Sequence, residues 1–112
     1  MNIDGAEWRR VLALLGLGAR GRLTVVGVEQ VRSAAIHGKL IYAVVALDAS
    51  AHSLKKIVPM LRAKGIGFAE GPSATALGKA VGKDSAAVVG IVDPQLAMGV
   101  RKIVEPGSSG AR

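Results

Sequence analysis

Residues 40–47 read Leu-Ile-Tyr-Ala-Val-Val-Ala-Leu, the longest apolar run in the chain. A continuous run of this kind predicts a strand covered on both faces, because a strand with one wet face would alternate apolar and polar residues. Val31 and Ala35 before the run, and Ile57 and Leu61 after it, recur at helical spacing. The run is therefore expected to be a central strand between two helices.

The same alternation continues through the rest of the chain. Further strands are predicted at 23–26, 66–70 and 86–92, and helices at 4–17, 27–37, 50–64, 73–81 and from 93 onward. Repeated glycine at 16–21 is expected to end the first helix. Strands alternating with helices predict an α/β fold, a sheet covered on both sides in an α/β/α sandwich. Residues 1–105 are expected to form one domain, and 106–112 a flexible C-terminal tail.

Composition narrows the class of protein. The chain has 112 residues, 50% of them hydrophobic, and no cysteine, which excludes disulfide frameworks and Cys-ligated zinc. Its net charge of +7 favours an anionic partner, with nucleic acid first; a merely solubilising surface charge is the alternative. No segment reaches the ~18 apolar residues of a membrane span, and the first residues lack a secretory signal pattern. The expected location is the cytoplasm, with no membrane partner.

Two glycine patterns resemble nucleotide-binding loops. Residues 16–21 match G-x-G-x-x-G, but they follow a predicted helix and precede a strand, the reverse of the order that phosphate binding needs. Residues 71–79 have the wrong glycine spacing for a phosphate loop, and Ala80 replaces the hydroxyl that would bind magnesium. A nucleotide enzyme is the weakest of the hypotheses.

Asp48, Ser50, His52 and Ser53 place an acid, a hydroxyl and a base in one stretch. A solvated helix start explains them more simply than a catalytic triad, whose members usually converge from separate segments. The chain contains only two histidines, with no pair at metal-ligand spacing. The sequence therefore predicts no enzyme, no cofactor and no metal.

An ordered set of segments carries a family resemblance: residues 27–40, 44–50, 71–73, 77–82 and 86–92. Together they resemble the kink-turn-binding ribosomal proteins of the L-seven-Ae type, most closely the small bacterial YlxQ-like branch. The resemblance implies a three-layer α/β/α sandwich with a mixed four-stranded sheet. It also implies RNA binding at two places, the start of the second helix and the loop before the fourth.

The family reads sheared G·A pairs with a Gly-x-Asn-Glu turn at the second helix. Here Glu29 stands at the Asn position, Gln30 at the Glu position and Ser33 at the position of a supporting Lys. An ionised Glu offers only acceptors, whereas Gln30 keeps a donor and an acceptor for a base edge. The loop that covers an extruded nucleobase in the family falls on Gly71, Pro72 and Ser73.

Four cations flank the second-helix start in the sequence. They are expected to bind phosphate in one cationic patch around Gly27, although a solvated surface is the plainer reading. The full set of expected RNA-binding residues is Arg20, Arg22, Gly27, Glu29, Gln30, Arg32, Ser33, Lys39, Gly71, Pro72 and Ser73.

The resemblance implies a non-catalytic RNA-binding protein that recognises a kink-turn-like or internally looped structured RNA. Ribosomal RNA, and with it the ribosome, are candidate partners, and no DNA specificity is expected. The alternative is a protein–protein interaction module of the same fold with a decayed RNA site, since the changes at Glu29, Gln30 and Ser33 remove the family's usual groups.

Overall fold

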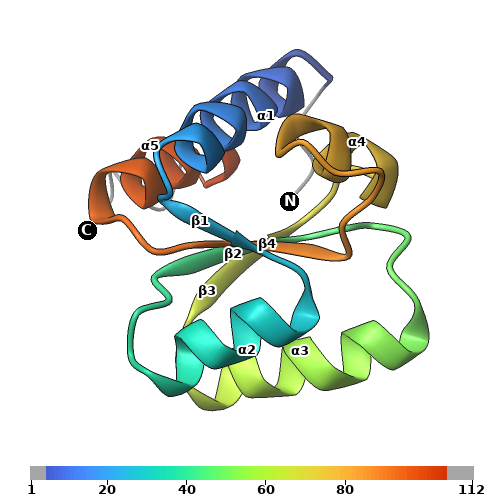
Figure 1. The fold of residues 1–112 in the computed structure, drawn as a ribbon, viewed down its shortest axis with the longest axis vertical. Coiled ribbons are helices and arrows are strands. Elements are labelled where there is room, and N and C mark those ends of the chain that lie inside the picture. The colour runs from blue at the N-terminus through green and yellow to red at the C-terminus, as the bar shows by residue number, and fades with distance from the viewer. Residues whose placement is uncertain (1–4, 106–112) are drawn as a thin grey trace.

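A computed structural model describes residues 5–105, which form a four-stranded sheet between two helical layers (Figure 1). The expected three-layer α/β/α sandwich is confirmed. The elements, in chain order, are α1 (Gly5–Arg20), β1 (Thr24–Val26), α2 (Val28–Ile36), β2 (Tyr42–Val45), α3 (Ala51–Ala63), β3 (Gly67–Glu70), α4 (Ala74–Ala80), β4 (Val88–Ile91) and α5 (Pro94–Val104). The tail expected at 106–112 lies outside the described residues.

The sheet has the strand order β1-β4-β2-β3 and is mixed, as expected. Strands β2 and β3 are parallel, and β4 is antiparallel to both β1 and β2. Strands β1, β2 and β3 therefore run in one direction and finish together. We call this the carboxyl end of the sheet; Gly27, Leu47 and Gly71 lie there, just beyond the strands. The opposite side, where Leu23 and Ile41 lead into β1 and β2, is the amino end.

Each face of the sheet has its own apolar core. Helices α1, α4 and α5 cover one face, and α2 and α3 cover the other (Figure 1). Strand β2 divides its residues between them: Tyr42 and Val44 join the first core, whereas Ala43 and Val45 join the second. All of β2 is buried, which confirms the central strand predicted from its continuous apolar run.

The first helix runs further than the sequence predicted. It continues through Gly16 and Gly18 to Arg20, because these glycines serve close packing between helices. A Cβ on Gly16 would lie 2.9 Å from the carbonyl oxygen of Ala80, and one on Gly18 would collide with the side chain of Leu96. The helix ends at Arg20, and residues 21–23 form the turn that leads into β1.

Side-chain caps begin three helices where the sequence placed them. Ser50 Oγ accepts from the amide of Ser53 over 3.1 Å, and Asp93 Oδ2 accepts from that of Leu96 over 2.9 Å. Ser73 caps α4 in the same way. Asp48 Oδ1 accepts from the amide of Ala74, the first residue of α4, over 2.7 Å. The acid considered above for a catalytic triad therefore also caps a helix.

Candidate nucleic-acid interface

Backbone hydrogen bonds join the turns at the carboxyl end of the sheet. The Gly27 amide donates to the carbonyl oxygen of Val88 over 2.9 Å, and the Leu47 amide donates to that of Pro72 over 2.8 Å. Ala46 links the two pairs, because its amide donates to Ala87 over 2.8 Å. The turns that begin at Gly27 and at Gly71 thus lie at the same end of the sheet, as the two-site expectation requires.

Gly27 forms the N-cap of α2 in a backbone conformation that glycine alone adopts readily. Its φ is 97° and its ψ 159°, and no atom beyond its two chain neighbours lies within 4 Å of where a Cβ would be. Packing therefore does not require glycine here; the backbone conformation does. The result is an open helix start at which a large ligand can approach the main chain and the positive end of the α2 dipole.

Glu29, in the first turn of α2, is held between two cations. Its carboxylate oxygens lie 3.4 Å from Lys56 Nζ on α3 and 3.7 Å from Arg32 Nη1. The Glu29 side chain is 71% exposed, so each pair contributes little to stability. The pairs nevertheless occupy two of the cations nearest the helix start. Lys56 was not among the predicted site residues, because it lies 27 residues away along the chain from Glu29.

The turn after β3 presents less surface than its sequence suggested. Gly71 is buried, and a Cβ there would lie 2.8 Å from Cζ2 of Trp8, so glycine makes room for the indole. The Gly71–Pro72 peptide bond is cis. Pro72 and Ser73 are half-buried, and Ser73 Oγ accepts from the amide of Ala76 over 3.1 Å. Pro72 and Ser73 therefore supply the accessible part of this turn.

Leu47 was not among the predicted site residues. It follows β2 at the carboxyl end, hydrogen-bonded to Pro72, and is 74% exposed. Within the apolar run it was indistinguishable from a core residue. The signal was its position at the end of the run, directly before the polar Asp48. An apolar side chain is thus exposed beside the Pro72 turn.

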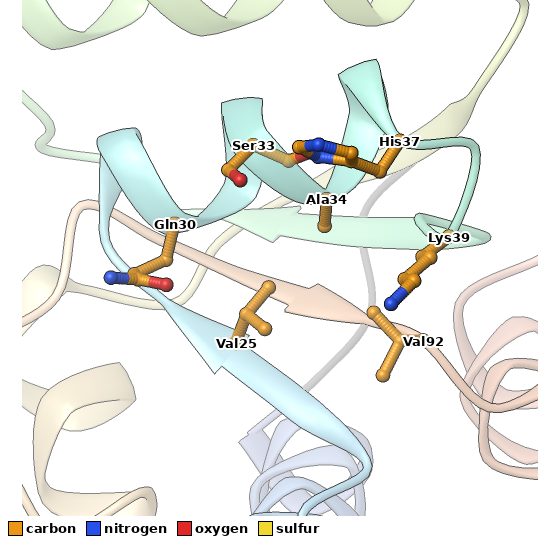
Figure 2. A pocket seen from close by; sticks show the side chains of 7 residues that line it. All are labelled: Val25, Gln30, Ser33, Ala34, His37, Lys39 and Val92. Carbon is orange, nitrogen blue, oxygen red and sulfur yellow. The ribbon is translucent and has the colours of Figure 1, made fainter.

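An open groove of about 380 Å³ runs along α2 beside the edge strand β1 (Figure 2). Its apolar walls are Val25, Ala34 and Val92. Its polar side chains are Gln30, Ser33, His37 and Lys39. Three of these four polar residues were predicted site residues, and the groove brings them together on one flank of α2.

His37 is the one polar residue of the groove that was not among the predicted site residues. Its Nδ1 lies 2.8 Å from the carbonyl oxygen of Ser33. A carbonyl can only accept, so Nδ1 carries the proton and donates. The other ring nitrogen, Nε2, then accepts a hydrogen bond in neutral imidazole and donates one in imidazolium.

The expectation of one cationic patch around Gly27 is wrong. Arg20 and Arg22 lie at the amino end, because the Leu23 carbonyl that follows them accepts from the Val92 amide over 2.9 Å, beyond the last residue of β4. The extended chain from Arg22 to Gly27 spans roughly 16 Å. The prediction failed because Arg20 and Arg22 precede β1 whereas Gly27 follows it, and an extended strand places the residues before and after it at opposite ends.

Lys39 shares the amino end with the two arginines, since it stands shortly before Ile41, whose amide donates to Ile91 over 2.8 Å. Arg32 alone of the four cations stays near Gly27, paired with Glu29. Within residues 5–105 no cluster of three or more His, Asp or Glu side chains is placed to hold a metal ion. The same residues contain no helix with the length and apolar character needed to span a bilayer.

Comparison with known proteins places the fold. No family model matches the chain, and no curated protein matches it by sequence. It is similar to a solved structure of a Bacillus halodurans protein of unknown function, with a TM-score of 0.79 and 29% identity over 85% of this chain and 96% of that one. It is also similar to the Giardia lamblia 15.5kD RNA binding protein, with a TM-score of 0.80 and 21% identity over 96% of this chain and 92% of that one. The mixed α/β fold expected from the resemblance is therefore confirmed.

Proposed function

We propose that this chain is a non-catalytic RNA-binding protein that docks a structured RNA with an internal loop, of the kink-turn kind, at the carboxyl end of its sheet. The observation that carries the proposal is the open Gly27 helix start, joined through backbone hydrogen bonds to the Pro72 turn. The net charge of +7 and the likeness to the Giardia RNA-binding protein support it.

The chemistry follows from the groups at this end. Gly27 lets the RNA backbone approach α2, and exposed Gln30 offers both a donor and an acceptor to a base edge. Phosphate binding there requires Arg32 and Lys56 to turn from Glu29, an exchange that these long, exposed ion pairs permit. Pro72 and Ser73, with exposed Leu47 beside them, offer a mainly apolar surface for an unpaired base.

Catalysis is not part of this proposal. The Asp48 carboxylate and the Ser50 hydroxyl oxygen each accept a backbone amide at a helix start. They are used as caps, and a reaction would need a base and a nucleophile directed at one point. We therefore expect recognition of RNA shape and base edges only. Kink-turn elements of ribosomal RNA are the first candidates for the natural partner.

The test is a pair of titrations. One uses a kink-turn RNA duplex and the other the same duplex with its G·A pairs changed to Watson–Crick pairs. We expect the kink-turn RNA to bind about tenfold or more tightly, the equivalent of one good base-edge contact. Equal affinities would contradict structured-RNA recognition. Binding to neither RNA would contradict RNA binding and favour the protein-interaction alternative.

A further inference from the structure

The groove beside α2 connects the two ends of the sheet. Gln30 lines it near the Gly27 turn, and Lys39 lines it at the amino end, with Ser33 and His37 between them on one flank of α2 (Figure 2). The nine residues of α2 cover roughly 13 Å. This length is enough for a short stretch of a nucleic-acid strand, a few nucleotides, to lie along the helix.

Three exposed cations lie at the amino end of the sheet, and one of them, Lys39, lines the groove. Lys39 is exposed there, and Arg20 and Arg22 are exposed in the segment that leads into β1. Strands β1 and β2 flank β4 on its two sides, so their leading segments are about two strand spacings, roughly 10 Å, apart. The two segments that carry these cations therefore enter the sheet on either side of the last residues of β4.

Arg22 has an unusual backbone. It lies shortly after the last residue of α1 and has a φ of 62°. Among residues 5–105 it is the only non-glycine residue with a positive φ. Its amide donates to Ala19 over 3.3 Å and the Leu23 amide donates to Gly18 over 2.8 Å, which is the hydrogen-bond pattern of a Schellman motif. Glycine is the usual residue at such a position. An arginine held here at a conformational cost suggests that its guanidinium has a use.

No carboxylate side chain lines the groove as the structure describes it. The two acids next to its lining residues in the sequence are engaged elsewhere. Glu29 pairs with Lys56 of α3, and Asp93 accepts from the Leu96 amide at the start of α5. An incoming phosphate would thus meet hydrogen-bond donors and cations, and no unpaired carboxylate would repel it. This arrangement favours a polyanion as the ligand, whereas a basic peptide would need carboxylates in the groove.

From these observations we infer that the groove carries one strand of the RNA as it leaves the internal loop, with its phosphates reaching Arg22 and Lys39. This inference rests on the proposed function and extends its footprint from the carboxyl end to the amino end. Along the way the strand meets Gln30, Ser33 and His37, whose polar groups suit ribose hydroxyls and phosphate oxygens.

The experiment compares two charge-matched double variants, Arg22→Gln/Lys39→Gln and the control Lys64→Gln/Lys102→Gln. All four positions are exposed, and Lys64 and Lys102 lie outside the groove. Each is titrated with a kink-turn RNA at several salt concentrations. Loss of two phosphate contacts should reduce the slope of log affinity against log salt by about 1.4 to 1.8, whereas the control slope should stay near that of the parent.

Trimming the RNA provides a second readout. Shortening the stem that leaves the internal loop should weaken binding by the parent and the control, but not further weaken binding by Arg22→Gln/Lys39→Gln. The inference is overturned if both double variants show the same salt slope and the same response to trimming. Preference for the G·A-containing RNA should survive in both double variants. A parent without that preference would instead contradict the proposed function itself.

Discussion

The backbone amide of Leu47 donates to the carbonyl oxygen of Pro72 across 2.8 Å, which binds the turn after β2 to the turn after β3. The same turn after β2 supplies Asp48, whose carboxylate caps α4 through the Ala74 amide. Two segments far apart in the sequence thus form one rigid surface at the carboxyl end. Gly27 lies at the same end, so an RNA that contacts α2 can also reach the Pro72 turn.

Replacing Glu29 with Gln should tighten RNA binding. The change frees Lys56 and Arg32 from their carboxylate partner and removes a charge that repels phosphate. We expect affinity to rise about 3- to 10-fold, with the slope of log affinity against log salt steeper by up to about 1. Folding stability should change by less than about 0.5 kcal/mol, because the pairs are exposed.

The control for Glu29→Gln is Asp84→Asn, which makes the same charge change at an exposed position between α4 and β4, outside α2 and its ion pairs. Titrations of both variants with the kink-turn RNA separate a local effect from one of net charge. Equal gains in the two variants would mean that Glu29 has no special relation to the RNA.

Replacing Arg22 with Gly should stabilise the protein while weakening its RNA binding. Glycine adopts the positive φ of this position without the steric cost to a side chain, which outweighs its greater freedom in the unfolded chain. We expect a gain of about 0.5–1 kcal/mol in the free energy of unfolding, measured by urea denaturation. A purely structural arginine would give the gain in stability with unchanged RNA affinity.

Tyr42 should make the protein sensitive to alkali. Burial, with a hydrogen bond donated to Glu105 Oε2 over 2.7 Å, raises the pKa of this phenol well above its usual value. Below about pH 10 both the folded and the unfolded chain keep the proton, and above it only the folded chain does. The contribution to stability is therefore complete below about pH 10 and is lost as the pH rises further.

This alkaline effect can be followed directly, because Tyr42 is the only tyrosine in the chain. The ultraviolet phenolate band should appear together with unfolding, and not at the pH of a free tyrosine. A phenolate that forms near pH 10 in the still-folded protein, as seen by circular dichroism, would show that Tyr42 is not held as described.

Gly78→Ala should destabilise the protein by about 1–3 kcal/mol. A Cβ at Gly78 would collide with the backbone of Ser85, where α4 packs directly against the chain leading to β4. Gly99→Ala is the matched control. Its Cβ would meet only Leu14 Cδ1 at 3.5 Å, so alanine should stabilise α5 by about 0.5–1 kcal/mol. Thermal melts that show equal effects of both changes would contradict this packing.

Local signals in the sequence were enough for most of the fold. The apolar run at 40–47 identified the central strand. Side-chain oxygens that can accept a free backbone amide marked three helix starts: Ser73, Asp93, and either Asp48 or Ser50, of which Ser50 is the cap. The predicted end of α1 was wrong. Glycine has a low intrinsic helix propensity, but close packing, with Gly18 against Leu96, outweighs it here.

The candidate site was only partly predictable. A resemblance indicated that the turns at Gly27 and Gly71 belong together, and the structure places both at the carboxyl end. Arg22 was predicted to lie beside Gly27 because the two are close in sequence. Strand β1 runs between them and places them at opposite ends of the sheet. The pairing of Glu29 with Lys56 depends on the packing of α2 against α3, which no local pattern encodes.

The most direct test of the central claim is a nuclear magnetic resonance titration of the ¹⁵N-labelled protein with a kink-turn RNA. We predict that the amide signals of Gly27, Gln30 and Leu47 shift first and most strongly, because these groups lie at the carboxyl end of the sheet. Saturating RNA that leaves these three signals in place, while shifting amides of α3 or β3 far from them, would contradict the account.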